Sequence, residues 1–162
     1  MSPAISGTPA LRLVQKVSSS RAFMKLAPHF LPAVDLAVHR LTRGKVQLSA
    51  QALPGLVLTA RGAKSGLPRR TPLACMPEAS GDWIVIGSNY GRPDHPLWTV
   101  NLLAHPDAEI NWRGRDIPVT ARLLEGEERA RVWEEALGFW PPYGLYQARV
   151  EREIRVFRLT PR

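Results

Sequence analysis

The chain has 162 residues, the size of one ordinary domain, with 44% hydrophobic and 22% charged residues. This balance excludes a largely disordered chain, and no apolar run approaches the roughly 20 residues needed to cross a bilayer. A single cysteine, Cys75, excludes an internal disulfide framework and a multi-cysteine zinc site. The first ten residues lack the basic start and apolar stretch of a signal peptide, so we expect a cytoplasmic protein.

The net charge of +8 is unevenly distributed along the chain. Residues 1–77 hold eleven Lys and Arg against one acidic residue, whereas residues 78–162 hold eleven Arg against thirteen Asp and Glu. A basic half attracts a phosphate-bearing cofactor, an acidic lipid surface or a nucleic acid. Charge alone leaves these partners open, together with a solvated basic surface that binds nothing.

Residues 1–44 are predicted to form a tail and a helical leader. Residues 1–9 are polar and contain proline, which is typical of a frayed end. Helices are expected over residues 10–26 and 32–42, because apolar residues recur at helical spacing in both and Gly44 can cap the second. We therefore divide the chain into a tail (1–9), a leader (10–44) and a cofactor-binding domain (45–162).

From residue 45 onward, short strands alternate with turns. Strands are expected over 46–50, 56–60, 69–76, 83–88, 108–112, 115–124 and 153–159, and helices over 96–104, 125–137 and a short piece after Pro142. Pro72 limits ladder bonding or places its strand at an edge, and Arg113-Gly114 turns a hairpin. About six strands with few helices between them favour a small antiparallel barrel with outer helices, a mainly β or α+β fold.

The strongest local motif is the loop at residues 61–68 with the residues that follow it. Gly62 and Gly66 allow a sharp bend, in which consecutive amides can converge on an anion. Cations and a hydroxyl donor crowd this bend: Arg61, Lys64, Ser65, Arg69 and Arg70. The pattern predicts a phosphate site but not a Walker loop, and a solvated basic hairpin explains it equally well.

The second motif runs from Gly87 to Trp98 and continues to Asn101. Small residues at the end of a strand let a flat ligand approach the backbone, and Tyr90 and Trp98 can stack on a planar ring. A turn with an aromatic plug is the structural alternative. His95 is interpreted as a loop or capping residue, and no metal site is predicted because no His, Cys and acid cluster has ligand spacing.

The third motif is the segment 139–146. Tyr143 and Tyr146 are three residues apart and share one face of a helical turn, so they can line an apolar pocket and offer a proton. Packing in the core or in a lid is the alternative. Cys75 is interpreted as a buried small hydrophobe rather than a nucleophile.

Together these motifs resemble the deazaflavin-dependent nitroreductase family, which has a split β-barrel fold. The resemblance spans Leu56 to Thr160 and rests on Gly62-x-Lys64-Ser65-Gly66-x-Pro68-Arg69, Thr71-Pro72-Leu73, Gly87-Ser88-Asn89, His95-Pro96-x-Trp98, Asn101-Leu102 and Pro142-Tyr143-x-x-Tyr146-Gln147. It implies a six-stranded antiparallel split barrel. It also implies hydride transfer from the reduced deazaflavin coenzyme F420 to a quinone or nitroaromatic acceptor.

The resemblance also implies a role for each motif. The cofactor's anionic tail is assigned to Arg61, Lys64, Ser65, Gly66 and Arg69. The ring system is assigned to Pro72, Leu73, Gly87, Ser88, Asn89, Tyr90 and Gly91, with Trp98 and Asn101 close behind. Tyr143 and Tyr146 correspond to an aromatic lid that faces the acceptor, and with Ser88 they are the expected catalytic residues.

Two departures from the family pattern affect these assignments. Ala63 stands where many relatives have a basic residue, so Arg61 or Arg70 is expected to substitute. Tyr90 stands where many relatives have glycine, so a narrower or aromatic pocket mouth is expected. In some relatives the leader supports membrane association; here contact with an anionic membrane, packing on the barrel and a homodimer all remain open.

Two alternatives to an F420 enzyme remain at this stage. A barrel of the same architecture could bind FMN or haem. A non-catalytic basic module could bind nucleic acid or anionic lipid, although the aromatic residues do not alternate with the basic ones as a nucleic-acid stacking platform requires. No nucleic-acid partner is therefore expected.

Overall fold

The computed structural model describes residues 53–162. The predicted tail, leader helices and strand at 46–50, and the boundaries drawn between them, lie outside the described residues. The described chain forms one antiparallel sheet in the order β2-β1-β5-β6-β7-β4-β3. The strands are β1 (Gly55–Arg61), β2 (Pro68–Ala74), β3 (Met76–Pro77), β4 (Trp83–Ile86), β5 (Asp107–Trp112), β6 (Arg115–Leu123) and β7 (Val156–Pro161).

Within residues 53–162, four helical segments lie outside this sheet, which confirms the predicted class of an antiparallel barrel with outer helices. They are the 3-10 turn η2 (Asn89–Gly91), α3 (Leu97–Ala104), α4 (Gly126–Phe139) and α5 (Pro142–Gln147). The described part of the sheet has seven strands rather than six. The strand predicted over 69–76 is divided: β2 ends at Ala74, and β3 is a two-residue segment from Met76 that pairs only with β4 in the described part of the chain.

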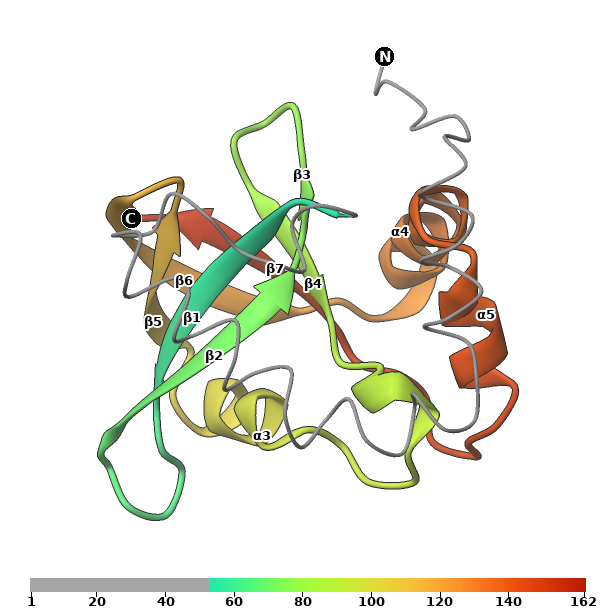
Figure 1. The fold of residues 1–162 in the computed structure, drawn as a ribbon, viewed down its shortest axis with the longest axis horizontal. Helices are drawn as coiled ribbons and strands as arrows, with labels where there is room; N and C mark the ends of the chain where they lie inside the picture. The colour runs from blue at the N-terminus through green and yellow to red at the C-terminus, as the bar shows by residue number, and fades with distance from the viewer. Residues whose placement is uncertain (1–52) are drawn as a thin grey trace.

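The sheet curls so that its two ends approach each other (Figure 1). β2 and β3 are the two edge strands, and residues of β2 contact β4 across the opening. Pro72 pairs with Val57 of β1, and β2 has no strand on its other side among residues 53–162. The prediction that Pro72 marks an edge strand is therefore confirmed, because proline cannot donate to a second neighbour.

The core fills the inside of the curl. Alternate residues of β1 and β7 point inward and are fully buried, among them Leu56, Leu58, Phe157 and Leu159. Each such side chain contributes about 1.5–3 kcal/mol on burial. Cys75 is also buried, and burial raises the pKa of its thiol, so it packs as a small hydrophobe as predicted.

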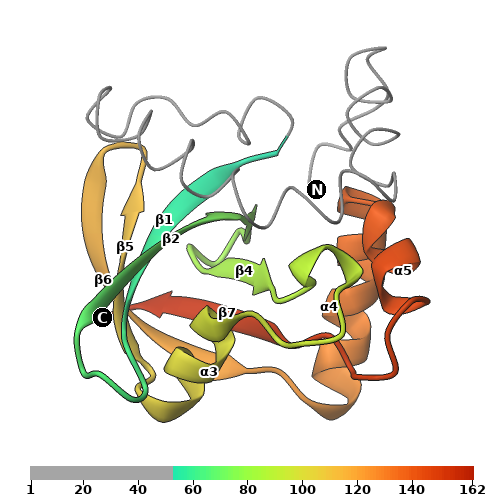
Figure 2. The same ribbon diagram turned by 60° about the horizontal axis from the view of Figure 1, so that its bottom comes forward.

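α3 lies across one end of the barrel, beside the loop that joins β1 to β2 (Figure 2). Trp98 of α3 packs on Phe157 of β7 with ring centroids 5.8 Å apart. α4 and α5 lie together on another side, next to η2 (Figures 1 and 2). Within residues 53–162, no helix has both the length and the apolar character that a membrane crossing requires.

The last strand begins at Val156, not at residue 153 as predicted. The backbone before it is bonded elsewhere: the Ile154 N–H donates to Gln147 Oε1 at 3.0 Å, and the Arg155 carbonyl accepts from the Gly87 N–H at 2.8 Å. Because these backbone groups bond to residues outside the sheet, they do not join the ladder, and the strand begins three residues later than predicted. The predicted hairpin turn is confirmed, since Arg113 and Gly114 both adopt positive φ (51° and 83°).

Candidate active site

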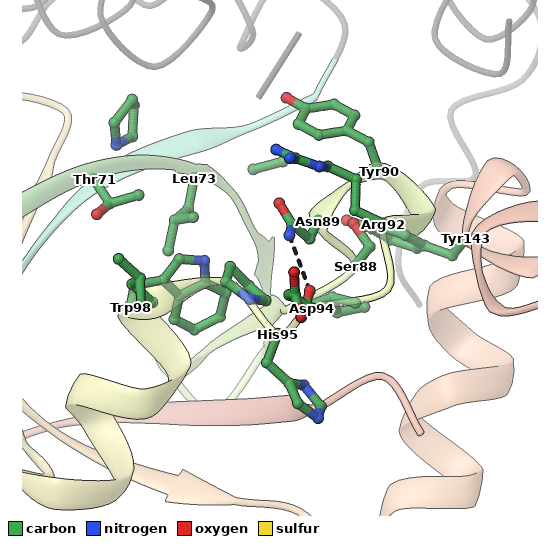
Figure 3. Close-up of a pocket in the computed structure, with 15 residues that line it drawn as sticks. Thr71, Leu73, Ser88, Asn89, Tyr90, Arg92, Asp94, His95, Trp98 and Tyr143 are labelled. Atoms are coloured by element: carbon green, nitrogen blue, oxygen red, sulfur yellow. Dashed lines mark hydrogen bonds between the residues drawn. The ribbon is translucent and has the colours of Figure 1, made fainter. Parts of the chain in front are cut away.

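A cleft of about 720 Å³ opens between the edge strand β2 and the segment at residues 86–98. Figure 3 shows Thr71 and Leu73 of β2 and Trp98 of α3 on one side, and Tyr90, Arg92 and Tyr143 on the other. Seven residues predicted from sequence line this cleft: Pro72, Leu73, Ser88, Asn89, Tyr90, Trp98 and Tyr143. Other lining residues were missed: Thr71, Ala74, Ile86, Arg92, Asp94, His95, Pro96 and Leu97.

The turn at residues 88–92 has an unusual backbone. Asn89, Tyr90 and Gly91 all adopt positive φ, at 48°, 54° and 74°. The left-handed conformation costs a residue with a side chain roughly 1–2 kcal/mol, so Asn89 and Tyr90 are strained. The Gly91 N–H donates to the Ser88 carbonyl at 3.0 Å, and Asn89 Nδ2 donates to the Asp94 carbonyl at 2.9 Å. Such strain persists where surrounding contacts hold the turn.

Arg152 supplies most of those contacts. Its guanidinium donates to the carbonyls of Gly87 (3.2 Å), Ser88 (2.9 Å) and Arg92 (3.1 and 3.3 Å). Its Nη1 also lies 3.3 Å from Nδ1 of His95. One half-buried side chain therefore holds the whole cleft turn, and sequence reasoning missed it because Arg152 lies some sixty residues away.

His95 contributes to the wall of the cleft, but Arg152 occupies one nitrogen of its ring. Burial, then Arg155 and Arg152, lower the pKa of His95 below its usual value of 6.5. The imidazole is therefore neutral at neutral pH, and Nδ1 accepts the hydrogen bond from Arg152. This supports the interpretation of His95 as a loop residue.

The two tyrosines of α5 have different positions. Tyr143 lines the cleft, whereas Tyr146 lies behind it, with ring centroids 6.3 Å from Tyr143 and 6.2 Å from Tyr90. A Cβ on Gly91 would lie 3.1 Å from Cα of Tyr146, so the turn packs directly on α5. Among the pair expected to face the acceptor, only Tyr143 lines the cleft, and Tyr146 packs beneath the turn.

Tyr143 is a hydrogen-bond donor at ordinary pH. Burial, and then the nearby Tyr146, Cys75 and Tyr90, raise the pKa of its phenol above the usual value of 10.0. The hydroxyl therefore stays protonated and can donate to a ligand oxygen, but it cannot act as a general base near neutral pH.

The bend between β1 and β2 is closed by its own backbone. The Gly62 N–H donates to the Leu67 carbonyl and the Gly66 N–H to the Gly62 carbonyl, both at 2.8 Å. Ser65 Oγ accepts from the Leu67 N–H (3.2 Å) and from Arg69 Nη2 (3.3 Å). Gly66 has a φ of 68°, which favours glycine, whereas a Cβ on Gly62 would lie 2.5 Å from Ser65 Oγ and would displace that hydroxyl.

The cations of this bend face solvent. Arg61, Lys64, Arg69 and Arg70 are exposed, and none pairs with a carboxylate within the described chain. From Arg69 to Leu73, β2 rises roughly 13 Å at the usual 3.3 Å per residue. The cationic bend and the cleft thus lie at the two ends of one edge strand.

Asn101 joins α3 to this bend, because its Oδ1 accepts from the Ala63 N–H at 2.9 Å. Asn101 was expected behind a bound ring; in the structure it bonds to the bend and is not among the residues that line the cleft. Gly87 and Gly91 likewise pack against protein rather than line the cleft. Across residues 53–162, no group of three His, Cys, Asp or Glu side chains is arranged to hold a metal ion.

Comparison with known proteins identifies similar chains. A family model described as F420H(2)-dependent quinone reductase matches residues 34–161. An F420H(2)-dependent quinone reductase of Mycobacterium tuberculosis is 34% identical over 130 residues, which cover 78% of this chain and 87% of the relative.

Two solved structures are also similar. An F420-H2 dependent reductase is 39% identical, with a TM-score of 0.59 over 65% of this chain and 93% of its own. A second structure, described as a domain-swapped dimer, is 35% identical, with a TM-score of 0.61 over 78% of this chain and 96% of its own.

Proposed function

The chain belongs to the F420H(2)-dependent quinone reductase family, and on that premise we propose how its residues hold the cofactor and the electron acceptor. The protein is an oxidoreductase that uses coenzyme F420, which supplies a hydride when bound in its reduced form, and the acceptor is a quinone. The family assignment favours F420 over the FMN, haem and nucleic-acid alternatives.

The shape and charge of the described residues fit the two ends of this cofactor. The cleft is lined by Leu73, Tyr90 and Trp98 and has a volume typical of small-molecule sites, which supports binding of a flat ring system there. The bend offers four exposed cations with no carboxylate partners among residues 53–162, which supports binding of a phosphodiester and an acidic tail. This pairing of a cleft that has aromatic and apolar side chains on its walls with a cationic bend carries the proposal.

At the bend, Lys64 and Arg69 bind the anionic tail, with Arg61 beside Gly66 as a further cation. Ser65 orients Arg69 through their 3.3 Å hydrogen bond and closes the bend. Asn101 holds the same backbone from α3. The charges are then presented from a fixed loop, which reduces the entropy lost on binding.

In the cleft, Pro72 and Leu73 pack against one side of the ring and the turn at residues 88–91 faces it. The backbone N–H groups of Ser88 and Asn89 have no acceptor within the described chain, so they can donate to polar atoms of the ring edge. Tyr143 donates its phenolic hydrogen toward the acceptor oxygen. Tyr146 acts through Tyr143 and the turn, as a packing partner.

Removal of two cations from the bend tests this assignment. We expect the double variant Lys64→Ala/Arg69→Ala to weaken F420 binding at least about 100-fold, since each charge-assisted contact contributes roughly 1.5–3 kcal/mol. Titration by fluorescence quenching measures the affinity, and circular dichroism checks the fold. Arg115→Ala, an exposed arginine at the start of β6, is the matched control. Unchanged affinity in the double variant would contradict the proposal.

Two proposals concern assembly. A homodimer is supported by the similar structure described as a domain-swapped dimer, and light scattering of the full chain tests it. Membrane contact through the N-terminal helices, like the expected cytoplasmic location, stays a prediction because residues 1–52 lie outside the described residues. Co-sedimentation of the full chain with anionic vesicles tests the membrane contact.

A further inference from the structure

We propose that Arg92 determines acceptor specificity by binding the acceptor oxygen on which negative charge develops during hydride transfer. The inference rests on the proposed function, because it needs the cleft to be the place where cofactor and acceptor meet. It concerns a residue that neither the sequence motifs nor the family resemblance singled out.

The backbone of Arg92 is fixed on both sides. Its N–H donates to the Asn89 carbonyl at 3.1 Å, and its carbonyl accepts from Arg152 at 3.1 and 3.3 Å. These bonds hold the residue immediately after the strained turn. The position from which the side chain leaves the backbone is therefore set by the fold.

The side chain extends over the cleft. Figure 3 shows the guanidinium of Arg92 running past Asn89, on the same side as Tyr90, toward the wall formed by Thr71 and Leu73. Arg92 is half-buried and lines the cleft. Its charge is thus partly withdrawn from water and directed at the space that a planar ligand would occupy.

The guanidinium of Arg92 differs from those of the other half-buried arginines in the described chain. Each of the other four donates to a protein oxygen: Arg129 to Ile154, Arg152 to three carbonyls, Arg155 to Thr99 and Arg158 to Glu78. The Arg92 guanidinium makes no hydrogen bond or ion pair within residues 53–162, and even Asp94, on the same cleft, does not pair with it. Five available donors on a half-buried cation are typical of an anion site.

The reaction produces such an anion. A hydride carries two electrons and one proton, so a neutral quinone that accepts it becomes a hydroquinone monoanion, and the donor is left oxidised by two electrons. The negative charge rests on oxygen until a second proton arrives from water. A guanidinium stays charged at every working pH and can stabilise this oxygen from the transition state onward.

A non-reacting probe separates this role from catalysis. The enzyme loaded with oxidised F420 cannot transfer a hydride, so ligand binding can be measured alone by calorimetry. Ionised 2-hydroxy-1,4-naphthoquinone mimics the anionic oxygen, and neutral 2-methyl-1,4-naphthoquinone is the uncharged comparison. We expect Arg92→Gln to weaken binding of the anion at least roughly tenfold and to leave binding of the neutral quinone unchanged.

Two further variants sharpen the comparison. Arg92→Lys keeps the charge without the planar fork, so it should retain part of the anion affinity. Arg115→Gln removes an exposed charge elsewhere and should leave the affinity for both ligands unchanged. In turnover with the neutral quinone, Arg92→Gln should lower kcat more than it raises KM, because the contact forms as charge develops.

The outcomes are distinguishable. If wild type and Arg92→Gln bound the anionic probe equally, the inference would be overturned. The proposed function would still stand, provided that both proteins bound F420. Loss of F420 affinity in Arg92→Gln would also overturn it, because Arg92 would then be a cofactor ligand. If the wild-type protein did not bind F420, the proposed function itself would fail, and the inference with it.

Discussion

Gly87 was predicted as part of a ligand site, and the structure shows that it is needed for packing against α3. The sequence predicted that its lack of a side chain lets a flat ligand approach the backbone. In the structure, Gly87 follows β4 and packs against Thr99 of α3. A Cβ there would come within 2.8 Å of Cγ2 of Thr99, which is fully buried and bonded to the Pro96 carbonyl at 2.8 Å. Thr99 has little freedom to move, so glycine is needed for packing.

We therefore expect Gly87→Ala to lower the free energy of unfolding by about 1–3 kcal/mol, the usual cost of overpacking. Urea denaturation followed by tryptophan fluorescence measures the change. Gly138→Ala is the matched control, because nothing lies within 4 Å of a Cβ at that helical position. The control should stabilise α4 slightly, by about 0.5–1 kcal/mol. A loss of stability in Gly138→Ala equal to that in Gly87→Ala would show that the contact with Thr99 is not the cause.

At the scale of elements, the cleft turn depends on a distant segment. Residues 87–92 form no sheet ladder, and three of their carbonyls accept from Arg152, which follows α5. On the other face, Gly91 packs on the backbone of Tyr146 in α5. The chain after α4 therefore holds the wall of the cleft, and the strain at Asn89 and Tyr90 is maintained from outside the turn.

Arg152→Met should release that turn. We expect F420 affinity to fall about tenfold, since the carbonyls lose a charged donor and the strained conformation loses its restraint. Faster hydrogen exchange at the Gly91 and Arg92 amides would identify a positioning role, and Arg152→Lys should give an intermediate result. Wild-type exchange at those amides together with weak F420 binding would argue against it.

At the scale of the whole molecule, an ion-pair network joins elements far apart in sequence. Arg158 on β7 pairs with Glu78 at 2.7 Å and with Glu128 on α4, and Arg122 on β6 pairs with Glu128 at 2.7 Å. Hydrogen bonds from Arg122 and then Arg158 lower the pKa of Glu128 from 4.5 to about 2. The network connects α4 and the turn that follows β3 to strands β6 and β7.

This depressed pKa predicts a loss of stability in acid. A carboxylate with a lowered folded-state pKa stabilises the protein fully above its unfolded value, and that contribution disappears as pH falls from about 4.5 toward 2. Urea midpoints between about pH 6 and pH 3 should fall more steeply for wild type than for Glu128→Gln. Parallel pH curves for the two proteins would contradict this role for Glu128.

Local sequence patterns predicted most of the strands within residues 53–162 and the bend between β1 and β2. Pro72 predicted an edge strand, Arg113-Gly114 predicted a hairpin, and the glycines at 62 and 66 predicted a sharp cationic bend. These features depend on local backbone geometry, which neighbouring residues specify. The same locality explains why the start of the last strand was misplaced, since Gln147 and Gly87 compete for its backbone from outside the segment.

How those pieces meet depends on contacts between residues that are far apart in sequence. The curl of the sheet brings β2 opposite the turn at residues 88–92, and Arg152 reaches across about sixty residues of sequence to the carbonyls that it holds. It also leaves the guanidinium of Arg92 facing the cleft without a hydrogen-bond or ion-pair partner in the described chain. Contacts of this kind form when a curved sheet closes around its core. They join residues that are far apart in sequence, so local sequence patterns do not predict them.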